Sequence, residues 1–152
     1  MGPVESKLHH LAVGSRDVAR LAEFYRDVFG LAELARHLDA AGSLRSVWLD
    51  LGGTILMVEH TAESPRCVAG VGAGPFLLAI RVSPPERERL ERELVSRGHT
   101  IDSRTAFTSY CRDVDGNRIG FSHYPDPGAP GAPHAPAPSE PGAERGTQND
   151  AR

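Results

Sequence analysis

The same order of expected secondary-structure elements occurs twice along this chain, and that repetition restricts the fold more than any other feature. In the first half, apolar spacing predicts a strand at 8–14, a helix at 17–30, a strand at 31–38, and a hairpin with strands at 43–51 and 54–60. After a linker at 61–74, the second half predicts a strand at 76–82, a helix from 83 to about 97, and strands near 100–103, 107–112 and 118–124. Both halves have the order βαβββ, which predicts an α+β fold built by internal duplication.

Both expected helices carry capping signals at their ends. Asp17 has the side chain of a good N-cap, and Gly30 tolerates the left-handed conformation that closes many helices. Ser83 and Glu86 have the spacing of a capping box, and Pro84 suits the first helical position. These signals support the two helices independently of their apolar periodicity.

Aligning the two halves by hand assigns strand residues to faces of the sheet. The alignment matches His10 with Leu77, Met57 with Gly120, and Trp48 with Cys111. Because side chains alternate along a strand, one set faces the helices, namely Leu56, Val58, Ile119 and Phe121. The opposite set, namely Met57, Glu59, Gly120 and Ser122, then faces a cavity if the helices lie outside. A glycine inside a strand weakens it, so Gly120 either provides room or replaces a side chain.

Bulk composition excludes several classes of partner. The net charge of −3 favours neither nucleic acid nor an anionic membrane, and no apolar run is long enough to span a bilayer. Cys67 and Cys111 are too few and too far apart in sequence for a disulfide framework, so a reduced cytoplasmic setting is expected. The N-terminus lacks the apolar segment of a signal peptide.

The last segment, 126–152, has a composition of its own. It holds six of the chain's 12 prolines and no aromatic residue. Such a segment buries too little apolar surface to offset its ordering entropy, which predicts a disordered tail with a solvated His134. The expected domain is therefore 1–125, with modules at about 7–60 and 75–125.

Two stretches resemble the opening and closing motifs of one family. LHHLAVGSRDVARLAEFYRDVFGL and RDVDGNRIGFSHYP are similar to those of the vicinal oxygen chelate superfamily, which contains glyoxalase I, bleomycin-resistance proteins and extradiol dioxygenases. The resemblance covers most of 7–125. It implies two βαβββ modules that form a curved mixed sheet, or half-open barrel, with helices outside and often a homodimer. Such a fold does not determine a reaction.

In metal-dependent members of that family, four strand positions face one divalent ion. The resemblance places these positions at His10, Met57, Leu77 and Gly120, with Glu59 two residues beyond Met57 on the same face. Only His10 has an expected ligand type, since a thioether suits such a site poorly and Leu and Gly offer no side-chain donor. His10 and Glu59 are the remaining candidate metal ligands.

The same residues have other possible roles. His10 either binds a ligand or is structural, whereas His9 should point to the opposite face. Glu59 is a candidate general base, since burial of a carboxylate raises its pKa, or a solvated residue at a strand end. Aromatic residues at Trp48 and Tyr110 either line a ligand cavity or fill the core. Cys111 is expected to be structural, and Arg112 and Arg118 either hold an anionic ligand or are solvated. By alternation His123 points away from the cavity, unless the twist at the strand end brings it to the mouth of the site.

Three functions remain open from the sequence. The favoured hypothesis is a small-molecule-binding protein with a degenerate metal site and no cofactor, whose ligand contacts are His10, Trp48, Met57, Leu77, Tyr110 and Gly120. The alternative is a lyase, isomerase or dioxygenase with one divalent metal ion held by His10 and Glu59. A third is a cofactorless enzyme with Glu59 or His10 as its base. Each predicts a small organic partner and a homodimer.

Overall fold

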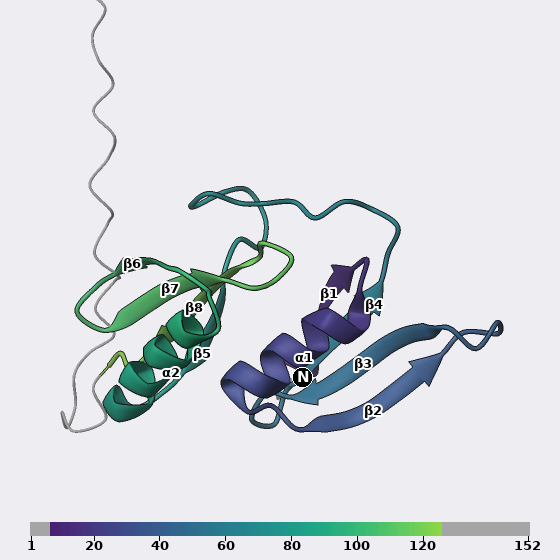
Figure 1. Cartoon of the computed structure of the whole chain (residues 1–152), viewed down its shortest axis with the longest axis horizontal. Helices are drawn as coiled ribbons and strands as arrows, with labels where there is room; N and C mark the ends of the chain where they lie inside the picture. Colours follow the sequence, from purple (N-terminus) through teal and green to yellow (C-terminus); the bar gives the residue numbers. More distant parts are fainter. Residues whose placement is uncertain (1–6, 126–152) are drawn as a thin grey trace, which may run out of the picture.

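The computed structural model describes residues 7–125 and shows two βαβββ modules (Figure 1). Module one contains β1 (His10–Ser15), α1 (Val18–Phe29), β2 (Glu33–Leu38), β3 (Leu44–Asp50) and β4 (Ile55–His60). Module two contains β5 (Leu78–Arg81), α2 (Pro84–Ser96), β6 (Ile101–Arg104), β7 (Thr108–Arg112) and β8 (Arg118–Ser122). The predicted order of elements is confirmed. The expected disordered tail with His134 lies outside the described residues.

Each module forms its own four-stranded mixed sheet. The strand orders are β1-β4-β3-β2 and β5-β8-β7-β6, and in both sheets the first strand runs parallel to the last while the other pairs are antiparallel. The two sheets therefore share one topology, as the duplication predicts. Hydrogen bonding divides the strands into two open sheets, one per module, and the α+β fold with helices on one side of each sheet is confirmed.

Helix α1 forms where the sequence signals place it. The Asp17 carboxylate accepts a hydrogen bond from the backbone N–H of Arg20 at 3.0 Å, and Gly30 closes the helix at φ 71°. A left-handed residue at this position costs glycine little. One face of the helix is buried against the sheet, with Leu21 and Tyr25 fully enclosed. This amphipathic packing fixes which side of the module-one sheet is covered.

Helix α2 begins with the predicted capping box. The Ser83 hydroxyl accepts from the backbone N–H of Glu86, and the Glu86 carboxylate accepts from the backbone N–H of Ser83 at 2.7 Å. This reciprocal bonding satisfies two N–H groups that lie outside the helical hydrogen-bond pattern. Leu90 and Leu94 are the buried residues of its inner face. Neither helix in residues 7–125 is long and apolar enough to cross a membrane.

One hydrophobic core joins the two modules, and α1 provides contacts across their boundary. The ring of Phe29 lies 6.1 Å from that of Phe121 on β8, and Phe24 lies 5.1 Å from His99. The Tyr25 hydroxyl donates to the Asp113 carboxylate at 2.8 Å. The modules are thus packed together on the helix side of their sheets.

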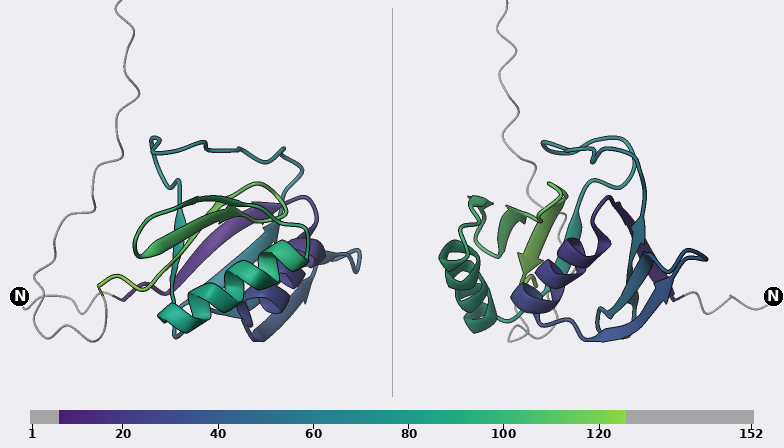
Figure 2. Two further views of the ribbon diagram at one scale, coloured as in Figure 1. Left: turned by 60° about the vertical axis from the view of Figure 1, so that its left-hand side comes forward. Right: turned by 45° about the vertical axis from the view of Figure 1, so that its right-hand side comes forward.

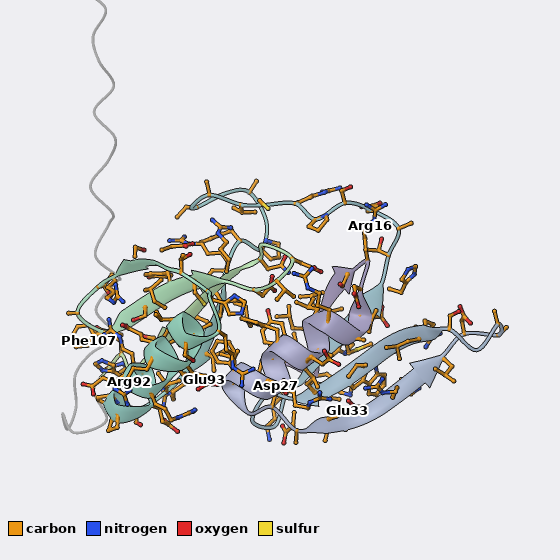
Figure 3. The ribbon with its side chains drawn as sticks, viewed as in Figure 1. Arg16, Asp27, Glu33, Arg92, Glu93 and Phe107 are labelled. Carbon is orange, nitrogen blue, oxygen red and sulfur yellow. The ribbon has the colours of Figure 1, made fainter. Side chains whose placement is uncertain are left out.

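The two helices also meet through charged side chains. Arg97, just beyond α2, lies 2.6 Å from Glu93 and 3.9 Å from Asp27 of α1. Figure 3 shows Asp27 and Glu93 on neighbouring stretches of the two helices. Residues 61–77 connect the modules without a helix or strand, and both views in Figure 2 show this segment arching across the edge of the two sheets. Cys67 of this linker packs close to Gly116 in the β7–β8 turn.

The strand register corrects one detail of the hand alignment. Trp48 pairs with Met57 and Tyr110 pairs with Gly120, so Trp48 corresponds to Tyr110. The expected match of Trp48 with Cys111 is wrong by one residue. The β7–β8 turn is one residue longer than the β3–β4 turn, which a hand alignment without a gap does not detect. A one-residue shift moves a side chain to the other face, so Cys111 lies in the core.

Candidate functional site

Each sheet has a face turned away from the helices, called here the open face of its module. Seven apolar helix-side residues of β3, β4, β7 and β8 have no solvent exposure, namely Val47, Leu49, Leu56, Val58, Cys111, Ile119 and Phe121. By strand alternation, the open face of module one carries His10, Ala12, Gly14, His37, Ser46, Trp48, Asp50, Met57 and Glu59. That of module two carries Ala79, Arg81, Thr108, Tyr110, Arg112, Arg118, Gly120 and Ser122.

The four positions singled out from the sequence lie on these faces. His10 starts β1 and is exposed, and Met57 is half-buried on β4. Leu77 precedes β5, and its Cδ1 lies 3.4 Å from the position that a Cβ on Gly120 would take. The structure therefore places Leu77 and Gly120 side by side on module two.

The backbone conformation at Gly120 does not require a glycine. Its φ lies outside the left-handed range, and an added Cβ would meet only side chains, at 3.4–3.5 Å from Leu77, Thr108 and Tyr110. These are ordinary contact distances, so the strand would accept alanine. Gly120 is buried beneath these three side chains, so the missing side chain leaves space for about a methyl group next to the Tyr110 ring.

His10 and Glu59 share a face but not a position on it. In the parallel β1–β4 pair, His10 lies opposite Ile55 and Glu59 lies opposite Gly14. Four residues of strand separate the two levels, about 13 Å at roughly 3.3 Å per residue. Two ligands of one ion each lie about 2.0–2.6 Å from it. The structure does not bring His10 and Glu59 of one chain together.

The donor set around these positions does not fit a divalent ion. His10 has a thioether, an isobutyl group and a glycine as its companions at the other three positions. The His10 ring already contacts its neighbour, since Nδ1 of His9 and Nδ1 of His10 lie 2.8 Å apart, and His9 is exposed as well. Within 7–125, no three His, Cys, Asp or Glu side chains are grouped closely enough to hold a metal.

Module one has a polar row across its open face. The strand pairing sets His37, Ser46, Glu59 and Gly14 side by side on β2, β3, β4 and β1. Ser46 has 0% exposure, and its Oγ has no hydrogen-bond partner among the described residues. The same holds for the buried His37 Nε2 and Trp48 Nε1, whose rings lie 4.9 Å apart. Leaving a buried polar group unpaired costs about 1–3 kcal/mol.

His37 and Ser46 were not among the residues singled out from the sequence. A signal for Ser46 was present: it lies two residues before Trp48, so period-two alternation places a polar side chain on the same inward face. The signal for His37 was weaker, because a bulge interrupts the β2–β3 register on either side of it. A bulge changes the face of a side chain in a way that a sequence pattern does not reveal.

On module two, the side chains at the positions of Ser46 and Glu59 are hydrogen-bonded to each other. Thr108 and Ser122 occupy the positions of Ser46 and Glu59, and the Thr108 hydroxyl donates to the Ser122 hydroxyl at 2.7 Å. The Arg118 guanidinium lies 4.7 Å from the centre of the Tyr110 ring, a cation–π arrangement. Arg112 donates to the Asp102 carboxylate and to the Gly116 carbonyl. This face is basic, whereas the open face of module one has carboxylates and neither lysine nor arginine.

Several titratable groups are buried away from both open faces. Burial raises the pKa of the Cys111 thiol to about 12, which keeps it protonated. Burial also raises the pKa of Asp113, although this carboxylate accepts hydrogen bonds from Tyr25 and Asn117 that lower it. The pKa of Tyr25 is raised well above its usual value by burial and by the Asp113 charge. Tyr25 and Asp113 join the modules and have a structural role.

His123 lies on the helix side of module two, as alternation predicts. Its Nε2 is 3.4 Å from Arg87 of α2, and its ring is 5.5 Å from that of Phe107. Arg87 also donates to the Ser109 hydroxyl and to the carbonyls of Thr105, Ala106 and Thr108. This guanidinium fixes the β6–β7 loop, so His123 belongs to a structural hydrogen-bond network.

A cavity of about 670 Å³ lies between the modules beside the linker. Ala12 and Gly14 from the open face of module one line it, together with Leu77 and Arg118 from module two. Its volume falls within the range of pockets that bind small organic molecules. The linker residues Thr61 and Glu63 also line this cavity.

Comparison with known proteins identifies a family. The family model described as Glyoxalase/Bleomycin resistance protein/Dioxygenase superfamily matches residues 7–121. A comparison with curated proteins found no match.

Solved structures with the same fold are similar over most of this chain. A glyoxalase/dioxygenase from Nostoc punctiforme has 22% identity and a TM-score of 0.66, with 80% of this chain and 93% of that chain covered. A lactoylglutathione lyase from Agrobacterium tumefaciens has 20% identity and a TM-score of 0.59, with coverage of 79% and 95%. The fosfomycin resistance protein FosX from Listeria monocytogenes, in complex with Mn(II) and dihydroxypropylphosphonic acid, has 15% identity and a TM-score of 0.65, with coverage of 77% and 91%. At these identities the likeness concerns the fold alone.

Proposed function

The chain belongs to the glyoxalase/bleomycin resistance protein/dioxygenase superfamily, and we propose that within it the chain binds a small organic molecule without a metal ion. The observation that carries this proposal is the donor set at the four strand positions of the metal-dependent relatives. Met57, Leu77 and Gly120 occupy three of them, and only His10 offers a nitrogen or oxygen ligand. Open faces of this chemistry suit an organic ligand better than a hard cation.

The same substitutions suit a partly apolar ligand. Gly120 leaves methyl-sized space beside the Tyr110 ring, and Leu77 adds an apolar wall next to it. Trp48 occupies the equivalent position on module one. Each of these two rings is an aromatic wall of its own open face, against which a planar molecule packs, and the two walls come together only across the dimer proposed below. The proposed ligand contacts are therefore His10, Trp48, Met57, Leu77, Tyr110 and Gly120.

A metal-dependent lyase, isomerase or dioxygenase is the alternative, and the register argues against it. Relatives of this fold use metal, as the Mn(II) of FosX illustrates. In this chain the two remaining candidate ligands, His10 and Glu59, lie four strand residues apart. A base role for Glu59 without a cofactor agrees better with the structure, since its half-buried carboxylate has no hydrogen bond or ion pair within residues 7–125.

We further propose that the protein is a homodimer in which unlike open faces meet. Arg81 and Ala79 on β5 are exposed, as are His10 and Ala12 on β1. The open face of module two carries Arg81, Arg112 and Arg118, while that of module one carries Asp50 and Glu59. Opposite charges on the two faces favour contact between the module-one face of one copy and the module-two face of another.

Sedimentation velocity tests the dimer. We expect a concentration-dependent dimer that weakens as salt is raised. Arg81→Glu should weaken dimerisation roughly fivefold or more, because it brings like charges together. The matched control is Arg92→Glu, which changes an exposed arginine on the helix side of the molecule (Figure 3). A monomer at all concentrations, or an equal effect of the two variants, would contradict the dimer.

Metal analysis tests the binding proposal. The protein is dialysed without chelator, bound Mn, Fe, Ni and Zn are measured per chain, and thermal unfolding is followed with and without each ion. We expect far less than one ion per chain and no rise in Tm, since a specific metal would stabilise the fold by mass action. Near-stoichiometric metal that is lost in His10→Ala and retained in His9→Ala would overturn the metal-free proposal.

A further inference from the structure

The open face of module one contains polar groups that the fold brings together and leaves unsatisfied. Ser46 lies between His37 and Glu59 on the adjacent strands, and its hydroxyl is fully buried without a partner in residues 7–125. The Trp48 indole N–H and the His37 Nε2 are also buried without a partner there. Three such atoms on two neighbouring strands are unusual, because buried polar groups are nearly always hydrogen-bonded.

Module two provides an internal reference for this arrangement. At the positions of Ser46 and Glu59 it has Thr108 and Ser122, whose hydroxyls bond to each other at 2.7 Å. The fold therefore permits a satisfied pair at this place in the sheet. In module one the Ser46 hydroxyl forms no such hydrogen bond, although Glu59, whose carboxylate is an acceptor, is the residue directly opposite it on β4. The unsatisfied state is thus a property of these side chains and not of the fold.

The hydrogen-bonding groups of the polar row and of the neighbouring Trp48 indicate which ligand would complement them. Glu59 carries a negative charge and only accepts hydrogen bonds, while the Trp48 indole only donates. Ser46 and His37 Nε2 are able to donate or accept. Among residues 7–125 of one chain, no lysine or arginine lies on this open face to neutralise Glu59, so a cationic ligand competes for this carboxylate only with the arginine face of the second copy in the proposed dimer. The Trp48 ring, half-buried beside His37, presents a π surface that attracts a planar cation.

We propose that His37, Ser46, Trp48 and Glu59 form a recognition subsite for a planar nitrogen heterocycle bearing an amino group or a positive charge. The inference rests on the proposed function, since it names the chemical class of the ligand on the same open face. The ring stacks on Trp48, and the cationic N–H group donates to Glu59. Rotation of the half-buried Glu59 and His37 side chains exposes the Ser46 hydroxyl, which then bonds to the same nitrogen group.

Three probes with one ring system separate charge from stacking. Isothermal titration calorimetry is carried out on the full chain with 9-aminoacridine, acridine and acridine-9-carboxylate. We expect 9-aminoacridine to bind at least tenfold more tightly than acridine-9-carboxylate, with acridine between them. If the carboxylate binds as tightly as the amine, the subsite is wrong while small-molecule binding stands. If none of the three binds, the subsite is overturned, while the proposal of metal-free binding is decided separately by the metal analysis.

Variants then test whether the preference for 9-aminoacridine comes from the side chains of the proposed subsite. Glu59→Gln should weaken 9-aminoacridine binding at least fivefold and Ser46→Ala about threefold, while both leave acridine binding within twofold. Ser122→Ala, at the matching position of module two, should leave all three affinities within twofold. Circular dichroism verifies that each variant is folded, and the comparison of probes on the unaltered protein does not depend on any variant. Equal effects of Glu59→Gln and Ser122→Ala would overturn the assignment.

Discussion

The two modules have the same topology and the same strand register but different chemistry on their open faces. Module one has an acidic carboxylate, an indole and a fully buried hydroxyl whose hydrogen-bonding capacity is not used. Module two has a satisfied hydroxyl pair and a guanidinium stacked on a tyrosine ring. The helix sides, in contrast, form one apolar core. Packing determines the helix side of a sheet, and the other side is free to vary with the ligand.

Helix α1 makes the two modules one unit, and the largest expected effect concerns this core. Phe121→Ala removes a fully buried ring that contacts Phe29 across the module boundary. We expect a loss of about 3–5 kcal/mol in the free energy of unfolding, the usual range for Phe→Ala in a core. Urea unfolding measures the loss. Trp48 fluorescence reports module one alone, and circular dichroism reports both modules.

The two signals also test whether the modules are coupled. In Phe121→Ala as in the unaltered protein, fluorescence and circular dichroism should follow one transition, because the core is shared. A Trp48 transition that keeps its original midpoint while circular dichroism shifts would show that module one folds independently.

A smaller effect is expected at the polar contact between the modules. Tyr25→Phe removes the hydroxyl that donates to the buried Asp113 carboxylate, and we expect a loss of about 1–3 kcal/mol. Tyr110→Phe, on the open face of module two, is the matched control and should change stability by less than about 0.5 kcal/mol. Thermal unfolding at pH 7 compares the two. Equal losses would contradict the role assigned to Tyr25.

The loss caused by Tyr25→Phe should depend on pH. Burial raises the pKa of Asp113 in the folded protein above its pKa in the unfolded chain, which is about 4. The ionisation of Asp113 therefore lowers the free energy of unfolding as the pH rises from about 4 through the folded-state pKa. The Tyr25 hydroxyl reduces this cost by lowering that pKa. Removing it raises the pKa further, so the difference between variant and unaltered protein should grow with rising pH and be smallest below about pH 4. A difference that is constant from pH 3 to pH 8 would contradict this account.

The smallest effect is expected at Gly120. Gly120→Ala adds a methyl group at ordinary contact distance from Leu77, Thr108 and Tyr110 without a strained φ. We expect a change of no more than about 0.5–1 kcal/mol, and of either sign, because reduced freedom of the unfolded chain offsets any crowding. Thermal unfolding measures it. A loss above about 2 kcal/mol would show that glycine is needed for packing rather than for room on the open face.

Much of the fold followed from local sequence signals. Asp17, Gly30 and the Ser83–Glu86 capping box each formed the contact that their residue types predict. Period-two alternation assigned Leu56, Val58, Ile119 and Phe121 to the core correctly. These features depend on neighbours within a few residues of the chain, which is the range over which a sequence pattern is informative.

The candidate site was less accessible to such reasoning. His37 joins Ser46 only through a register that two bulges alter, and the separation of His10 from Glu59 depends on the parallel pairing of β1 with β4. Both are contacts between strands far apart in sequence. The same holds for the Tyr25–Asp113 contact, which joins residues 88 positions apart. Alternation identifies the face of a residue but not its partner on the neighbouring strand.

The Trp48 indole provides the most direct test, because the chain has one tryptophan. In a ¹H–¹⁵N spectrum its side-chain N–H gives a single cross-peak. We predict that 9-aminoacridine, added to protein free of metal, shifts this cross-peak in a saturable way and that Glu59→Gln weakens the response. Saturable binding of 9-aminoacridine that leaves the indole cross-peak unmoved would contradict the claim that the open face of module one holds the ligand.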